Sequence, residues 1–136
     1  MHTIARFLCA AALAGASLSA FAADNPLSVH ILDLQSGQPT AGVAVTLEQR
    51  DGPAWRALGS AVTDAQGRVR ALYPADKPFT AGAYRIVFKI GEHYARLRQP
   101  TFFEQIPIEF KVMDTAQHYH IPLLLSPYGY STYRGN

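Results

Sequence analysis

The sequence predicts an all-β protein, a β-sandwich of two stacked sheets with seven or eight strands and one short helix. Two observations support the strands. Short runs rich in β-branched and aromatic residues alternate with clusters of glycine, proline and other turn residues, at the spacing typical of a sandwich. Within 43–50, Val43, Val45 and Leu47 alternate with smaller or polar residues, as in a strand with one buried face.

The chain begins with a segment typical of a secretory signal peptide. A basic start is followed by an uncharged, alanine-rich stretch at 7–22, and Ala20-Phe21-Ala22 supplies a small-x-small cleavage site. We expect a signal peptide at 1–22, with a cut after Ala22 or alternatively Ala23, and one domain at 23–136. The alternative is a membrane anchor, but a span needs ~20 strongly apolar residues. We therefore expect secretion across the inner membrane, a periplasmic location if the source is Gram-negative, and no membrane contact in the mature form.

The first strand of the domain is expected at 27–34, where LSVHILDL precedes a turn rich in glycine and proline. Further strands are expected at 43–50, 54–63, 68–73, 82–90, 105–113, 118–126 and 128–134. The segment 91–99 breaks the alternation and spaces Tyr94 and Leu97 three apart, which predicts a helix. Proline cannot donate a backbone hydrogen bond, so Pro107 and Pro122 predict a sheet edge or a bulge at those positions.

Composition excludes several kinds of function. Cys9, the only cysteine, lies in the expected leader, so the mature chain has no disulfide, thiolate nucleophile or cysteine-based metal site. The net charge of +2 is small and its charges are scattered, which argues against a nucleic-acid partner. We find no phosphate-binding loop, Ser-His-Asp pattern or paired carboxylates, so covalent and phosphoryl-transfer chemistry lack support.

Strand alternation brings candidate functional side chains onto common faces. His30 shares a face with Ser28 and Leu32, and His118 shares a face with His120. Near the end of the chain, Ser131 and Tyr133 share a face. Arg68 begins its strand directly after a turn, where an arginine can reach over a sheet edge.

Each candidate also has a purely structural interpretation. A lone histidine in a strand is usually a half-buried polar residue, and the tyrosines suit a core or an edge. His118 and His120 could bind zinc as a pair on one face, but carboxylate partners at suitable spacing are absent and His93 lies in the expected helix. We therefore expect no metal and no cofactor. The residues alone predict a secreted β-sandwich with a possible imidazole–guanidinium site.

Three separated motifs resemble the transthyretin-like family in its enzymatic branch, the 5-hydroxyisourate hydrolases. They are LSVHILDLQSGQPTAGVAVTL at 27–47, TDAQGRVR at 63–70 and HYHIPLLLSPYGYSTYRGN at 118–136, in the order that the family requires. In the hormone-carrying branch, the positions of His30, Arg68 and His120 hold lysine, glutamate and threonine. The hydrolases usually end in YRGS, whereas this chain ends in Asn136, so a role for the final serine hydroxyl is in doubt.

The resemblance implies a homotetramer in which His30, Arg68, His120 and Tyr133 converge on a central channel and bind a flat, polar ring. The implied reaction opens the six-membered ring of 5-hydroxyisourate by hydrolysis, giving 2-oxo-4-hydroxy-4-carboxy-5-ureidoimidazoline in urate breakdown. His30 and His120 would orient and deprotonate water, Arg68 would counter negative charge, and Tyr133 would contact the ring. Which histidine is the base stays open. The competing hypotheses are a transthyretin-like ligand carrier and a secreted interaction module, neither of which turns over a substrate.

Overall fold

Two four-stranded sheets stacked face to face form the domain in a computed structural model that describes residues 24–136. The expected signal peptide lies outside the described residues. The elements are β1 (Leu27–Asp33), β2 (Ala44–Asp51), β3 (Ala54–Val62), β4 (Arg68–Val69), β5 (Gly82–Phe88), α1 (Ile90–Arg96), β6 (Ile106–Val112), β7 (Tyr119–Ser126) and β8 (Gly129–Thr132). The predicted all-β sandwich with one short helix is confirmed.

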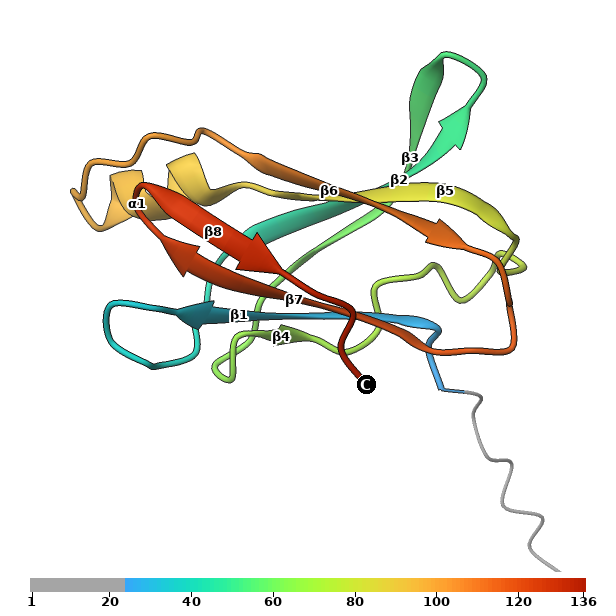
Figure 1. Cartoon of the computed structure of the whole chain (residues 1–136), viewed down its shortest axis with the longest axis horizontal. Helices are drawn as coiled ribbons and strands as arrows, with labels where there is room; N and C mark the ends of the chain where they lie inside the picture. The colour runs from blue at the N-terminus through green and yellow to red at the C-terminus, as the bar shows by residue number, and fades with distance from the viewer. Residues whose placement is uncertain (1–23) are drawn as a thin grey trace, which may run out of the picture.

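The first sheet has the strand order β4-β1-β7-β8, so it contains both the first strand and the last two (Figure 1). β1 and β7 run parallel, with Ser28 opposite His120 and His30 opposite Pro122. β4 pairs antiparallel with the other edge of β1, which places Arg68 opposite His30. The sheet therefore sets the three predicted motifs side by side.

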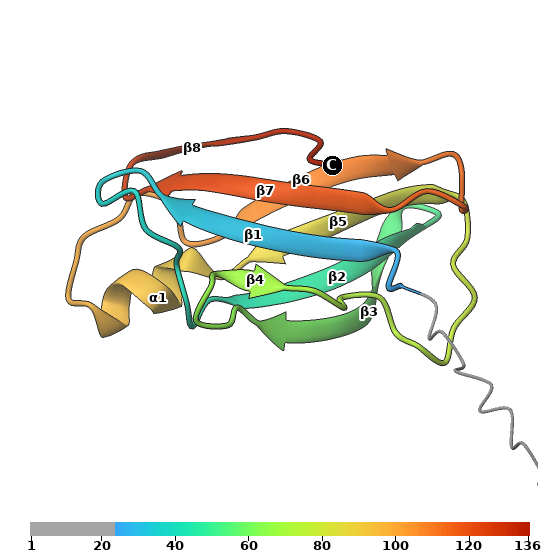
Figure 2. The ribbon, with the colours of Figure 1, turned by 90° about the horizontal axis from the view of Figure 1, so that it is seen from below.

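The second sheet has the order β3-β2-β5-β6 and covers the inner face of the first (Figure 2). Long antiparallel ladders join these strands, interrupted by a register shift between Leu47 and Glu48 of β2. α1 lies at one end of the sandwich. Within residues 24–136, no helix is long and apolar enough to cross a membrane.

The core fills the space between the sheets with alternate residues of each strand. In β1, Leu27, Val29 and Ile31 are fully buried, while the intervening side chains are only half-buried on the outer face. β7 follows the same alternation, with Leu123 and Leu125 fully buried. Burial of large aliphatic side chains stabilises the sandwich by roughly 1.5–3 kcal/mol each. The period-two interpretation of both strands is confirmed.

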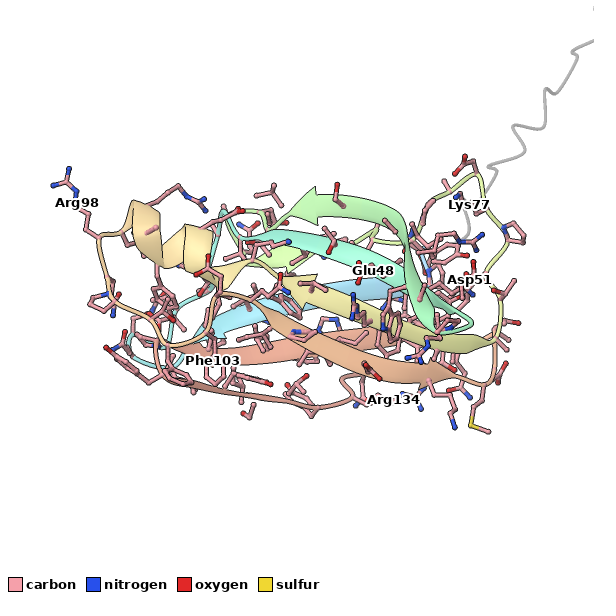
Figure 3. All side chains as sticks on the ribbon, turned by 90° about the horizontal axis from the view of Figure 1, so that it is seen from above. Glu48, Asp51, Lys77, Arg98, Phe103 and Arg134 are labelled. Carbon is pink, nitrogen blue, oxygen red and sulfur yellow. The ribbon has the colours of Figure 1, made fainter. Side chains whose placement is uncertain are left out.

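Two predicted elements differ from the structure. β4 was expected at 68–73 but pairs only over Arg68–Val69. The chain then bends so that Leu72 and Tyr73 insert into the core, and the Tyr73 amide donates to the Asn25 side chain rather than to a ladder. The helix begins one residue early and ends at Arg96, because Arg98 takes a left-handed conformation with φ 53°. The Arg98 side chain points away from the body at that end (Figure 3).

The two strand prolines have different environments. Pro107 lies in β6, an edge strand, as predicted. Pro122 lies in β7, an inner strand, so an edge position is wrong for it. The ladder between β7 and β8 reaches only to the pair Leu123–Thr132, and the Thr132 hydroxyl donates to the Pro122 carbonyl at 2.7 Å. The missing N–H is tolerated because regular pairing ends there.

Candidate active site on the outer face of the first sheet

A tight turn positions Arg68 at the start of β4. The Asp64 carboxylate accepts hydrogen bonds from the backbone N–H groups of Gln66 and Arg68, both at 2.9 Å. These donors lower the pKa of Asp64, the Arg68 amide most, so the carboxylate stays charged. Gly67 has a φ of 70°, and an added Cβ would lie 2.6 Å from the Ile31 carbonyl oxygen, so glycine is required. The DAQG sequence therefore forms a tight turn that fixes the position of Arg68 at the start of β4.

The pair of His30 and Arg68 lies on the outer face of the sheet. The two residues are directly opposite in the antiparallel β1–β4 ladder, and both side chains are half-buried. Burial lowers the pKa of His30, and the Arg68 guanidinium lowers it further. His30 is therefore neutral at neutral pH, with a nitrogen lone pair available.

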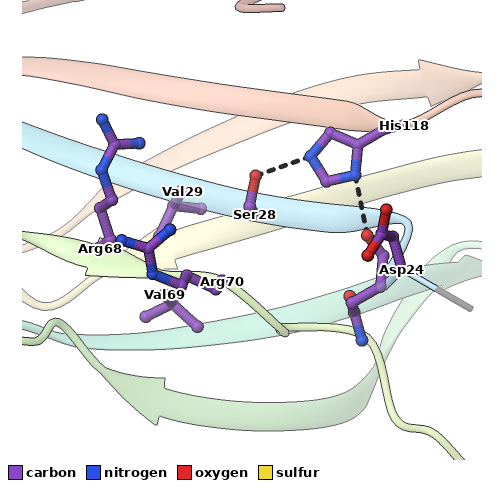
Figure 4. A pocket seen from close by; sticks show the side chains of 8 residues that line it. Asp24, Ser28, Val29, Arg68, Val69, Arg70 and His118 are labelled. Atoms are coloured by element: carbon purple, nitrogen blue, oxygen red, sulfur yellow. Dashed lines mark hydrogen bonds between the residues drawn. The ribbon is translucent and has the colours of Figure 1, made fainter. Parts of the chain in front are cut away.

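β7 adds His120 beside this pair, and a hydroxyl from β1 holds it. The Ser28 Oγ lies 2.8 Å from His120 Nδ1 and 2.8 Å from His118 Nε2. His118 in turn places its Nδ1 2.8 Å from the Asn25 carbonyl oxygen. Figure 4 shows the hydrogen bond between Ser28 and His118. The parallel register makes the contact possible, because Ser28 is directly opposite His120.

The electrostatic environment also favours the neutral form of His120. Burial lowers its pKa, and Arg68 and the two neighbouring imidazoles lower it further. Three of the influences on its pKa are charges on neighbouring side chains, so Arg68, His30 and His118 all act on His120 electrostatically. The structure therefore brings together three of the four predicted site residues on one outer face.

The end of the chain packs directly on the His120 ring. The Gly135 amide donates to the His120 carbonyl at 2.9 Å. A Cβ built on Gly135 would lie 2.5 Å from His120 Cδ2 and 3.1 Å from Pro122 Cγ. Only a residue without a side chain can approach so closely, which gives the glycine of the terminal YRG sequence a physical role.

A polar hollow of about 390 Å³ adjoins these groups. Its lining includes Ser28, Arg68, Arg70, His118 and Asp24 (Figure 4). His30 and His120 do not line it; they lie next to it through their ladder partners Arg68 and Ser28. Its volume falls in the range of small-molecule sites.

Arg68 is available to a ligand. Among residues 24–136 its guanidinium makes no hydrogen bond and no ion pair, although its backbone amide is bound by Asp64. A guanidinium cannot lose its proton and offers a planar set of donors to a carbonyl or oxyanion. Beside two neutral imidazoles, this arrangement can deprotonate water and stabilise the oxyanion that forms when water attacks an acyl carbon.

Tyr133 shares a hollow with His120 but not with His30 or Arg68. Its side chain is 59% exposed and lines a second hollow, of about 300 Å³, together with Ile108, Phe110 and His120. Its assigned contact with the substrate stays a prediction. The part of the chain that is described contains no group of three or more His, Cys, Asp or Glu residues placed to hold a metal ion.

Sequence reasoning missed the supporting residues of this site. Ser28 was recognised only as sharing a face with His30, and His118 only as a face neighbour of His120 and a possible zinc ligand. Gly135 was recognised only as part of a terminal motif. A single strand does not reveal which residue of a partner strand lies opposite, so the Ser28–His120 pair has no local signal. A glycine beside a histidine-rich strand signals close approach only once the two are known to be neighbours.

Comparisons with known proteins point to one family for this chain. The HIUase/Transthyretin family model matches residues 27–135. A 5-hydroxyisourate hydrolase from Salmonella dublin is 46% identical over 135 residues, 99% of this chain and 98% of its own length. The structure of Klebsiella pneumoniae 5-hydroxyisourate hydrolase has a TM-score of 0.70 at 39% identity, covering 81% of this chain and 98% of that one. Transthyretin from Sparus aurata reaches 0.75 at 32% identity, covering 81% and 96%. Backbone similarity therefore does not separate 5-hydroxyisourate hydrolases from transthyretins.

Proposed function

Because this chain belongs to the HIUase/transthyretin family, we propose that it hydrolyses 5-hydroxyisourate in urate catabolism. The product is 2-oxo-4-hydroxy-4-carboxy-5-ureidoimidazoline, and the enzyme is a cyclic amide hydrolase. The observation that carries this proposal is the unpaired Arg68 guanidinium beside two neutral imidazoles, His30 and His120, on one outer face. A carrier of apolar ligands has no use for that combination.

The chemistry follows from the three groups. One imidazole takes a proton from water as the water oxygen bonds to the acyl carbon of the ring. Arg68 stabilises the negative charge that develops on the acyl oxygen. When the C–N bond breaks, the ring nitrogen receives a proton from the imidazolium, which restores the neutral base. Charge and protons balance without a metal or cofactor.

The test generates 5-hydroxyisourate in place with urate oxidase and follows the decay of its ultraviolet absorbance. Decay should be much faster with the protein than without it. Decay at the spontaneous rate would reject the enzyme and leave the carrier or the interaction module. Prior treatment with a chelator should not change the rate. Activity lost to the chelator and restored by zinc would instead revive a metal site at His118 and His120.

We also propose that the working form is a homotetramer. β8 lies at a sheet edge, and Tyr128, Tyr130 and Tyr133 are 69%, 40% and 59% exposed. Aromatic side chains on an open edge invite pairing with another chain. A neighbouring subunit would cover them and close the outer face, so that Tyr133 could contact the substrate there. Light-scattering mass, measured together with turnover, tests this; an active monomer would contradict it.

Secretion is the last part of the proposal. The pattern at 1–22 supports a signal peptide, and a cut after Ala22 or Ala23 leaves β1 whole. The enzyme would be periplasmic in a Gram-negative source. Mass analysis from a secreting host should find a first residue of Ala23 or Asp24. A full-length product in the membrane fraction would favour an anchor.

A further inference from the structure

We propose that His118 and Ser28 are positioning residues that hold His120 in one tautomer, with Nδ1 protonated and Nε2 free to act as the base. This inference rests on the proposed hydrolysis for its catalytic consequence. The tautomer itself can be measured without any substrate. Three hydrogen bonds in series determine the tautomer, beginning at the Asn25 carbonyl oxygen, which can only accept.

The Asn25 carbonyl oxygen fixes the direction of the chain. A carbonyl oxygen can only accept a hydrogen bond, so His118 Nδ1, at 2.8 Å from it, carries a proton. A neutral imidazole has one protonated nitrogen, and so His118 Nε2 bears a lone pair. His118 is exposed and lines the hollow.

The hydroxyl of Ser28 passes this direction to His120. Its single proton is donated to the lone pair on His118 Nε2, at 2.8 Å. The Ser28 oxygen is then an acceptor toward His120 Nδ1, also at 2.8 Å, so that nitrogen is the protonated one. His120 Nε2 is left with the lone pair. The three bonds thus select one tautomer of His120 out of two.

The sequence left open which histidine is the base, and this order of bonds identifies it as His120. The general base needs a free nitrogen, and the other ring nitrogen needs a partner that holds the ring and stabilises its charged form. Ser28 is that partner, in the place that a carboxylate occupies in many histidine-based sites. Within residues 24–136 His30 has no hydroxyl partner, and the hydrogen-bonding influence on its pKa comes from the Gln66 backbone. We assign it instead to orienting water or substrate.

Nitrogen-15 NMR of the histidine rings tests the assignment directly, because protonated and unprotonated ring nitrogens have well-separated shifts. In the wild-type protein, both His118 and His120 should be protonated at Nδ1. In His118→Phe the serine proton has no acceptor on that side and should move to His120, giving a ring protonated at Nε2. A wild-type His120 protonated at Nε2 would overturn the proposal.

Kinetics supply the second readout. His118→Phe and Ser28→Ala should lower kcat between roughly tenfold and hundredfold, less than the ~10²–10⁴ of a whole general base. Ser28→Thr keeps a hydroxyl on the strand and should restore most of the rate. Ser60→Ala, an exposed serine of β3, is the matched control and should leave kcat unchanged. A flipped tautomer in His118→Phe with unchanged kcat would reject the role of His120 as base. A wild-type protein without turnover would reject the proposed function, while the NMR result would still decide the tautomer.

Discussion

The outer faces of the two sheets carry similar kinds of side chain but use them differently. On the second sheet, Arg85 forms an ion pair with Glu48, which lies near the middle of that face in Figure 3. The Arg85 guanidinium also lies 4.6 Å from the centre of the Trp55 ring. On the first sheet, Arg68 has no such partner among residues 24–136, and the imidazoles of His118 and His120 bind a hydroxyl and a carbonyl instead of a carboxylate.

This difference shows where chemistry is possible. A cation whose charge is already matched within the subunit stabilises the fold and has little left to offer a ligand. A cation without a partner contributes little to stability, but it can bind an oxyanion that appears only during a reaction. The first sheet therefore carries the reactive face and the second sheet a structural one, although both follow the same alternation along their strands.

The largest expected effects come from replacing Arg68 or Arg85 by alanine, which should separate the catalytic role of the first from the structural role of the second. Arg68→Ala should lower turnover by about 10²–10³ because it removes the donor for the oxyanion. Its unfolding free energy should change by less than about 0.5 kcal/mol. Arg85→Ala should keep full turnover and lose about 1 kcal/mol of stability with its ion pair and cation–π contact. Turnover assays and denaturant unfolding measure both; a reversed pattern would contradict the comparison.

A smaller effect should follow from crowding the reactive face at the end of the chain. Gly135→Ala would put a methyl group 2.5 Å from His120 Cδ2, so the ring or the tail must move. We expect turnover to fall by about tenfold to hundredfold, with the fold retained. The matched control is Gly129→Ala in the same terminal segment, where the nearest atom would be Ser126 Oγ at an ordinary 3.7 Å. Equal activity of the two variants would show that the tail does not set the position of His120.

The smallest expected effect is a shift of the pH profile. The pKa values of His30 and His120 are lowered, so the active neutral forms persist below pH 6.5. As pH falls through these lowered pKa values, the rings gain protons and kcat/KM should decline. Arg68→Gln removes a positive charge that lowers both, so its residual activity should decline at a higher pH than the wild type. Arg85→Gln should leave the profile in place. A profile of Arg68→Gln shifted the other way would contradict the assignment.

Most of the fold could be predicted from the sequence, together with the faces on which the candidate site residues lie. The alternation in β1 and β7 correctly separated Val29 and Ile31 from His30, because the pleat determines the face of every residue in a regular strand. The turn chemistry of DAQG correctly placed Arg68 at a strand start. These features depend on neighbours in the chain, and so they are visible in it.

The rest depends on which strands lie side by side. Pro122 was expected at a sheet edge or a bulge, yet β7 is an inner strand whose ladder with β8 ends near the proline. Leu72 and Tyr73 suggested a longer β4, but they enter the core from a bent segment. The Ser28 bridge between two histidines needs the register of a parallel pair, for which a single strand contains no information.

The parallel pairing of β1 with β7 has a consequence for how the chain becomes active. Ser28 and His120 are separated by 92 positions, and the bonds of His118 to Ser28 and Asn25 span 90 and 93. Closing such a long loop is slow compared with forming the hairpins of the second sheet. During synthesis, β1 emerges first and waits with an unpaired edge until the last strands arrive. We therefore expect catalytic competence to appear late in folding, after the sandwich has collapsed, and no nascent chain that lacks the end of its sequence to open the ring.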